Sequence, residues 1–156
     1  MKQKIMETIG YIFNGFSIAL FIYLQSIIKI SDSLQYISYV GWILLFAGVV
    51  LIVLSIISLV RNKGAGLIDH GVYKLIRHPM YVGAMLCFLS YFFFCPHWSI
   101  LLISSANIAV IYWFILQGEE QNIIRFGDTY NHYMKNTPRA NLLTGIYKYF
   151  KNNLIK

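Results

Sequence analysis

Charged residues are scarce in this chain of 156 residues. They make up 12% of the sequence, whereas hydrophobic residues make up 58%. A soluble domain needs about a quarter of its residues charged, because its surface must be polar. The composition therefore excludes an ordinary water-soluble domain. Acidic residues are the rarest, with 6 Asp and Glu against 13 Lys and Arg, so the formal net charge is +7.

Cysteine is also scarce, and this limits disulfide and metal chemistry. The two cysteines, Cys87 and Cys95, fall within or at the end of an apolar stretch, where a packing role is more typical than a disulfide. The histidines do not show the spacing of a zinc site, so no metal site is predicted. The four histidines are His70, His78, His97 and His132.

Long uncharged stretches take the place of the missing polar residues. Residues 8–28, 33–60 and 79–118 contain no Asp, Glu, Lys or Arg. A helix that crosses a bilayer needs about 20 apolar residues, so the first two stretches fit one helix each and the third fits two. Pro96 divides the third stretch at a short turn. We therefore predict one all-α integral membrane domain over 1–156, a bundle of about four transmembrane helices at about 8–28, 35–60, 79–95 and 97–117, with the last two forming a hairpin.

The basic residues predict the orientation of these helices. With four spans, twelve Lys and Arg lie on the side of both termini and only Lys29 lies on the other side. This asymmetry predicts a multi-pass protein with cytoplasmic N- and C-termini. Because the basic residues flank membrane spans, they do not indicate nucleic-acid binding. The first apolar run is too long for a signal peptide and lacks a clear cleavage site, so it is predicted to remain as a span.

Two polar segments separate or follow the spans, at residues 61–78 and 118–156. Three glycines in the first segment predict a loop with tight turns. In the second, apolar residues at helical spacing predict that the fourth span continues as an amphipathic helix, weakened at Gly127 and ended by Pro138. The final residues mix aromatics with lysines. They predict a cytoplasmic amphipathic helix on the anionic leaflet, with a frayed tail as the alternative.

Candidate chemistry is concentrated where polar segments meet spans. Arg77 and His78 precede Pro79, which is well placed in the first turn of a helix, and Glu119 and Glu120 end the fourth span. Adjacent carboxylates at such a depth are costly unless they are solvated or paired. Arg77, Arg125 or a bound sulfonium, amine or ribose hydroxyl would be a suitable partner. The alternative is that Arg77 and His78 are only interfacial anchors.

These two clusters resemble a known family. The run GVYKLIRHPMYVG is similar to the G-x-Y-x-x-x-R-H-P-x-Y-x-G signature of the isoprenylcysteine carboxyl methyltransferase and phospholipid methyltransferase superfamily. The pattern Glu119-Glu120, Phe126-Gly127, Tyr130, Tyr133, Pro138 resembles its E-E…F-G-x-x-Y-x-x-Y…P motif. The resemblance covers residues 64–140, about the C-terminal half, and the first two spans match only in being hydrophobic.

The resemblance implies an enzyme that uses S-adenosylmethionine to methylate a lipid-like or prenylated acceptor drawn from the bilayer. It places catalytic roles on His78 and Arg125, and acceptor contacts on Arg77 and Gln117. The cofactor-binding residues that it implies, within 64–140, are Ala65, Gly66, Leu67, Ile68, Tyr73, His78, Pro79, Tyr81, Glu119 and Glu120.

One departure from the pattern leaves the acceptor open. Isoprenylcysteine enzymes usually carry an arginine shortly before the glutamates, but residues 111–117 end in Gln117 and contain no arginine. The acceptor is therefore a carboxylate or, as in phospholipid N-methylation, an amine. Two other classes stay as alternatives: an NADPH-dependent sterol or steroid reductase, which shares a related C-terminal layout, and a non-enzymatic scaffold or channel subunit. The sequence does not indicate an oligomeric state.

Overall fold

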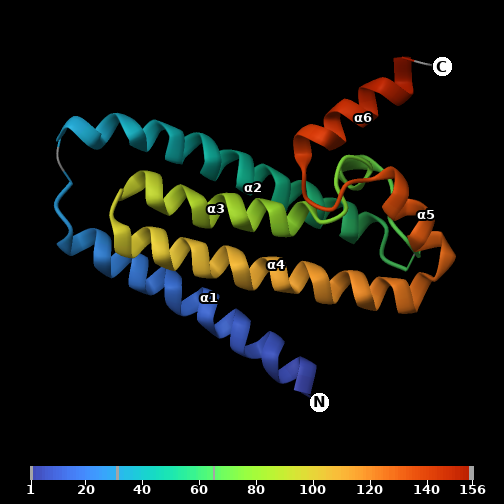
Figure 1. Cartoon of the computed structure of the whole chain (residues 1–156), viewed down its shortest axis with the longest axis horizontal. Coiled ribbons are helices and arrows are strands. Elements are labelled where there is room, and N and C mark those ends of the chain that lie inside the picture. The colour runs from blue at the N-terminus through green and yellow to red at the C-terminus, as the bar shows by residue number, and fades with distance from the viewer. Residues whose placement is uncertain (1, 31, 65, 155–156) are drawn as a thin grey trace. The chain divides into compact units, whose positions relative to one another are not determined.

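The computed structural model describes residues 2–30, 32–64 and 66–154, and the surroundings of side chains over 5–30, 35–64 and 66–151. Within these ranges all regular structure is helical, which confirms the predicted all-α class. In chain order (Figure 1), the elements are α1 Lys2–Ile27, the 3₁₀ helix η1 Asp32–Ile37, α2 Ser38–Arg61, the 3₁₀ helix η2 Gly71–Lys74, α3 Pro79–Phe94, α4 Trp98–Phe126, α5 Asp128–Asn136 and α6 Leu142–Leu154.

Among the described residues, three helices are long and apolar enough to cross a membrane. The spanning segments are Ile5–Ile27, Gln35–Arg61 and Trp98–Phe126. The third predicted span, 79–95, corresponds to α3, which is apolar but has only 16 residues. At 1.5 Å per residue this helix is about 24 Å long. Its length is limited because Pro79 begins the helix and the turn before Pro96 ends it.

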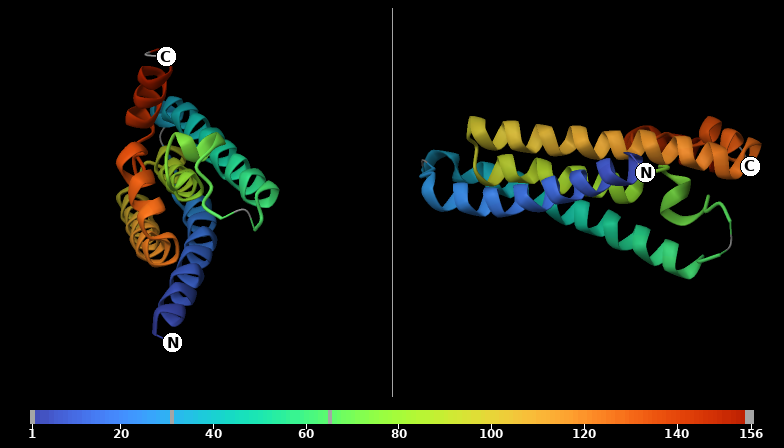
Figure 2. Two further views of the ribbon diagram at one scale, coloured as in Figure 1. Left: turned by 90° about the vertical axis from the view of Figure 1, so that its right-hand side faces the viewer. Right: turned by 90° about the horizontal axis from the view of Figure 1, so that it is seen from below.

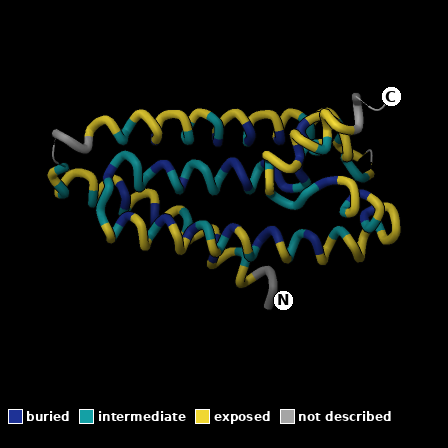
Figure 3. The backbone as a smooth tube through the Cα atoms, turned by 45° about the horizontal axis from the view of Figure 1, so that its top comes forward, coloured by how far each residue is buried: buried dark blue, intermediate teal, exposed yellow. Residues whose placement is uncertain are grey.

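The long helices expose apolar side chains, as lipid-facing helices do. In α2, for example, Ile43 and Phe46 are 67% and 73% exposed, and Phe16 of α1 is 65% exposed. Exposed residues recur along these helices in Figure 3. So much exposed apolar surface would aggregate in water, whereas a bilayer solvates it. The predicted helical membrane bundle is confirmed.

The chain divides into two compact units, and the first comprises residues 1–48 and 84–114. The α3–α4 hairpin that the sequence predicted runs through it, and the two helices lie side by side in both views of Figure 2. Phe21 of α1 stacks on Tyr91 of α3 with ring centroids 4.0 Å apart. Phe21 also forms a buried cluster with Cys95 and Ile100. Cys95 therefore packs in a core as predicted, and both cysteines are free.

The second unit comprises residues 49–83 and 115–156 and contains both polar segments. In the first segment Gly64, Gly66 and Gly71 have φ values of 90°, 87° and 61°, a region that favours glycine. The predicted loop is confirmed, with η2 as its one regular turn. Gly127, at φ 54°, separates α4 from α5, and α5 ends two residues before Pro138. The final residues form α6 rather than a frayed tail up to Leu154.

Close packing in the first unit can be tested at two glycines. A Cβ added to Gly41 would lie 3.0 Å from a ring carbon of Phe94 and 3.2 Å from the Phe93 Cβ, whereas one added to Gly15 would meet nothing within 4 Å. We expect Gly41→Leu to lose about 1–3 kcal/mol through overpacking. Gly15→Leu should be neutral or slightly stabilising, because leucine favours a helix more than glycine does. Thermal unfolding in detergent compares the two; equal midpoints would contradict this packing.

Candidate functional site

Arg77 connects the loop before α3 to the end of α5. Its backbone N–H donates to the Pro138 carbonyl over 3.0 Å. Its Nη1 donates to the carbonyls of Met134 and Thr137 at 2.9 and 2.8 Å. A cation is well placed there, because the last carbonyls of a helix lack intrahelical partners and carry partial negative charge. Arg77 thus caps α5 with its Nη1, while its Nε and Nη2 face Glu119 of α4.

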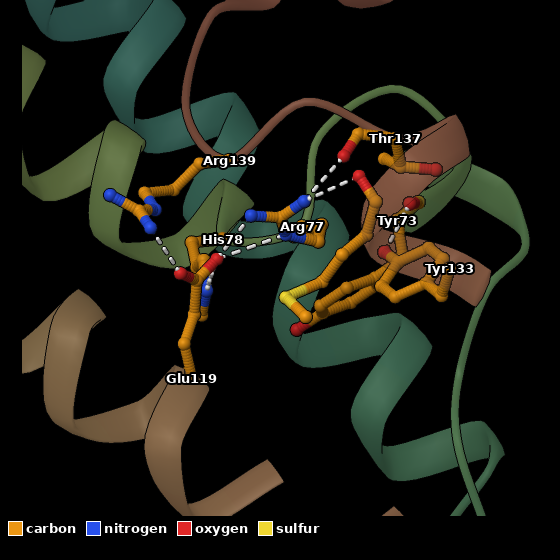
Figure 4. A network of polar contacts seen from close by, with 8 residues as sticks. Tyr73, Arg77, His78, Glu119, Tyr133, Thr137 and Arg139 are labelled. Atoms are coloured by element: carbon orange, nitrogen blue, oxygen red, sulfur yellow. Dashed lines mark hydrogen bonds and ion pairs between the residues drawn. The ribbon is translucent and has the colours of Figure 1, made fainter. Parts of the chain in front are cut away.

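The Glu119 carboxylate lies between two arginines (Figure 4). Arg77 donates to its Oε1 from both Nε, at 3.0 Å, and Nη2. Arg139 approaches the other oxygen, Oε2, with its Nη2 at 2.6 Å. The Glu119 and Arg77 side chains are 6% and 8% exposed, against 39% for Arg139. The Glu119 carboxylate, whose burial would be costly without a partner, is therefore paired within the protein by arginines from two other segments.

His78 completes this cluster as a neutral side chain. Its ring is 7% exposed, and its Nε2 lies 3.4 Å from Glu119 Oε1 without forming a hydrogen bond to the described residues. Burial lowers the pKa of His78 to about 4, and the neighbouring Glu119 carboxylate only partly offsets this effect. The imidazole is therefore uncharged at neutral pH. It can accept a proton only weakly.

Two tyrosines connect the loop to α5 next to the cluster. The Tyr133 hydroxyl donates a 2.5 Å hydrogen bond to the Tyr73 carbonyl, and Figure 4 shows both side chains beside Arg77. Burial raises the pKa of both phenols above its usual value. Tyr130, one turn before Tyr133, is 1% exposed, and its hydroxyl makes no hydrogen bond to the described residues. All three phenols stay protonated at neutral pH and can donate hydrogen bonds.

A pocket of about 190 Å³ lies in this unit, lined by both motif blocks. Arg77 lines it and also contacts Glu119, so the pocket and the buried cluster share a wall. Arg125 lines it too, with its guanidinium 5.0 Å from the centre of the Phe126 ring. The complete lining is Leu59, Gly66, Leu67, Ile68, Tyr73, Arg77, Asn122, Arg125, Phe126, Tyr130 and Tyr133.

The structure brings together many of the predicted site residues, but not all. Gly66, Leu67, Ile68, Tyr73, Arg77 and Arg125 line the pocket, whereas His78 and Glu119 belong to the buried cluster. Pro79 is buried in the first turn of α3, and the Tyr81 ring centroid lies 6.0 Å from that of His78. Gln117 is half-buried and lies outside the pocket lining. Ala65 lies outside the described residues.

The adjacent glutamates differ sharply in their surroundings. Glu119 is buried between the arginines, whereas Glu120 is exposed. Successive helical residues point about 100° apart, so only one of two neighbours can face the loop. Arg125 lies six residues beyond Glu119, on another side of α4. It lines the pocket, and the second arginine on Glu119 is Arg139.

Several residues of the site were not predicted as site residues. Phe126, Tyr130 and Tyr133 line the pocket although the sequence marks them only as motif residues, and Leu59 lines it without any signal in the sequence. Arg139 follows Pro138 of the motif directly, and this adjacency is the only signal in the sequence for its role. The Thr137 carbonyl accepts from Arg77 through its backbone, which leaves no side-chain pattern. Asn122 lies one turn beyond Glu119 on α4 and lines the pocket, and its spacing from Glu119 could have suggested this.

The two glutamates provide a matched test of the buried cluster. Glu119→Gln removes the only carboxylate between Arg77 and Arg139, and breaking a buried pair from one side costs about 3–5 kcal/mol. We expect the thermal midpoint in detergent to fall by roughly 10 °C. Glu120→Gln should leave it within 2–3 °C, roughly the effect of an exposed substitution. Equal midpoints for the two variants would show that the arginines do not depend on Glu119.

Comparison with known proteins identifies a family for this chain. No curated protein and no solved structure matches the chain significantly. A family model, phospholipid methyltransferase, matches residues 16–126. This range includes the C-terminal part of α1, all of α2, α3 and α4, and both the Arg77-His78-Pro79 and the Glu119-Glu120 blocks. Because the match covers well over half of the sequence, the chain belongs to the phospholipid methyltransferase family.

Proposed function

We propose that this membrane methyltransferase transfers the methyl group of S-adenosylmethionine to a lipid-like acceptor at the cytoplasmic membrane face. The observation that supports this most directly is the pocket that both motif blocks line, beside the Arg77–Glu119 pair. The second polar segment begins in the last turns of α4, so a water-soluble cofactor and a membrane-embedded acceptor both have access to such a site. On this proposal, 1–156 is one methyltransferase domain whose cofactor-binding part is 64–140.

The pocket residues fit the chemical groups of this cofactor. Tyr73, Phe126 and Tyr133 offer aromatic rings, which stack on an adenine and attract a sulfonium cation. Arg125 suits the carboxylate of the cofactor. The unpartnered Tyr130 hydroxyl and the backbone of Gly66 supply further hydrogen-bonding groups. The bound cofactor supplies an electrophilic methyl group.

The residues of the chain mainly position the reactants and exclude water. Displacement at a sulfonium disperses charge as it proceeds, so the protein gains most by aligning donor and acceptor and keeping water out. Arg77 has its donors engaged by Glu119, Met134 and Thr137. We therefore assign Arg77 the role of a positioning residue that fixes the pocket wall, rather than an acceptor ligand.

The weak basicity of the site favours a carboxylate acceptor over an amine. An amine must lose a proton before methylation, but His78 has a pKa of about 4 and Glu119 is engaged by two arginines. A carboxylate needs no base. Arg139 is 39% exposed and is the arginine best placed to hold such a group. It would replace the arginine that is missing near Gln117.

The proposed orientation of the chain in the membrane is supported by its charges. The positive-inside asymmetry supports cytoplasmic N- and C-termini. In that orientation the polar segments that carry Arg77, Glu119 and Arg139 lie on the cytoplasmic side, together with the water-soluble cofactor. The proposal requires this orientation.

Calorimetry on detergent-solubilised protein tests the cofactor. We expect binding of S-adenosylhomocysteine and none of NADPH. Arg125→Gln should weaken S-adenosylhomocysteine binding by roughly tenfold to a hundredfold, because it removes a hydrogen bond to a charged group worth about 1.5–3 kcal/mol. Arg61→Gln, at the end of α2 and outside the pocket lining, is the control. Heat with NADPH alone would favour a reductase instead, and no binding of either would favour a non-enzymatic role.

A pH profile with two acceptors tests the acceptor class. We expect methylation of a prenylated cysteine carboxylate at a rate that is flat from pH 6 to 8. The reason is that His78, with its lowered pKa of about 4, stays neutral throughout this range and gains a proton only in more acidic solution. Arg139→Gln should raise KM for the acceptor with little change in S-adenosylhomocysteine affinity, and the exposed Lys135→Gln should change neither. A phosphatidylethanolamine-type amine methylated faster, at a rate that rises with pH, would reverse the assignment.

A further inference from the structure

Helix α6 carries an apolar stripe that no part of the described protein covers. Leu143, Ile146, Tyr147 and Phe150 are 80%, 37%, 65% and 59% exposed. Their spacing of i, i+3, i+4 and i+7 places them on one face of the helix. The described charged residues of α6 are Lys148 and Lys151, with no acidic residue in the helix. α6 also lies outside the range 16–126 that the family model matches.

The opposite face of α6 packs on the loop that carries the site residues. A Cβ added to Gly145 would overlap the carbonyl oxygen of Leu75 and lie 3.4 Å from a ring carbon of Pro138. Only glycine lets the helix backbone approach this closely. On the same face, the Tyr149 ring centroid lies 5.1 Å from the Lys74 ammonium. Lys74 and Leu75 directly precede the segment that contains Arg77.

Helix α6 also approaches the surroundings of Arg77 through Pro138. The carbonyl of Pro138 accepts from the Arg77 N–H, and its ring lies beside Gly145. Both segments that hold Arg77, the loop and the 134–138 stretch, therefore meet α6. A force that holds α6 in place also holds Arg77 and the pocket wall to which it belongs.

We propose that α6 binds the anionic leaflet through its exposed stripe and lysines, and that its packing on Leu75 and Pro138 couples this binding to the cofactor pocket. The lipid surface is the occupant that the charge selects: lysines without acids complement anionic headgroups, while the aromatic and aliphatic stripe suits the interface. The leaflet is also near α6 along the chain. Helix α4 belongs to a membrane-spanning segment and ends only 16 residues before α6 begins. The surface assignment stands independently of the proposed function, whereas the coupling rests on it.

Leaflet binding can be measured with the full chain in lipid nanodiscs. An environment-sensitive NBD label on Tyr147→Cys should shift to the blue, and be quenched by spin-labelled lipid, more strongly in phosphatidylcholine with 30% phosphatidylglycerol, roughly the charge of an anionic leaflet, than in phosphatidylcholine alone. The label on native Cys87 and Cys95 is measured in parallel as background. Lys148→Gln with Lys151→Gln should remove most of the difference, at roughly fivefold per lysine. Lys135→Gln on α5 is the matched control.

Two results would overturn the leaflet assignment. One is emission that is identical in the two kinds of disc or unaffected by the double lysine substitution. The other is a cross-link between the α6 helices of two chains that shields Tyr147 in neutral discs, which would make a second copy the occupant.

Coupling is measured by S-adenosylhomocysteine affinity in the same discs. We expect binding several-fold tighter, roughly the effect of one lysine, in the anionic discs, and the gain should be lost in the double lysine variant. A shifted label with unchanged affinity would overturn the coupling. A shifted label with no cofactor binding in any disc would instead refute the proposed function and leave the leaflet assignment intact.

Discussion

The buried pairing of Glu119 with Arg77 and Arg139 is the interaction on which the site depends. A carboxylate at the end of a long apolar helix is costly without a partner, and the buried Arg77 would be costly without the carboxylate. The three residues come from α4, from the loop before α3 and from the segment after α5. The pairing therefore joins pieces of chain that lie far apart in sequence. Arg77 extends the connection by capping α5 with its remaining donors.

This pairing changes how the signature residues are understood. The sequence leaves the partner of the glutamates open between Arg77, Arg125 and a bound group, and it also makes Arg77 a candidate for contact with the acceptor. In the structure Arg77 and Glu119 pair with each other, and the pocket is lined by aromatic residues, by residues 66–68 of the loop and by Arg125. The charged residues of the signature motifs, Arg77 and Glu119, then hold the segments of the site together. On the proposed function, Tyr73, Arg125 and Tyr130, which line the pocket, would face the ligand.

Much of the fold was predictable because it follows from local physical constraints. Uncharged runs of sufficient length specify membrane helices, Pro79 begins α3, and Gly127 interrupts the helix at a positive φ. The site was predictable only where a local motif marks it. The contrast between Glu119 and Glu120 depends on which neighbour faces the loop, and the role of Arg139 depends on a contact across 20 residues of sequence. Neither leaves a periodic pattern.

The shortness of α3 has a consequence for the bilayer itself. The hydrocarbon core of a typical membrane is about 30 Å thick, whereas 16 helical residues extend about 24 Å. A helix with this hydrophobic mismatch draws the headgroup regions toward each other or lets water reach its ends, at a cost of fractions of a kcal/mol per ångström. His78 and Pro79 stand at the start of that helix. The thickness of the membrane therefore affects the surroundings of His78 and Pro79, and thin bilayers accommodate α3 with the least deformation.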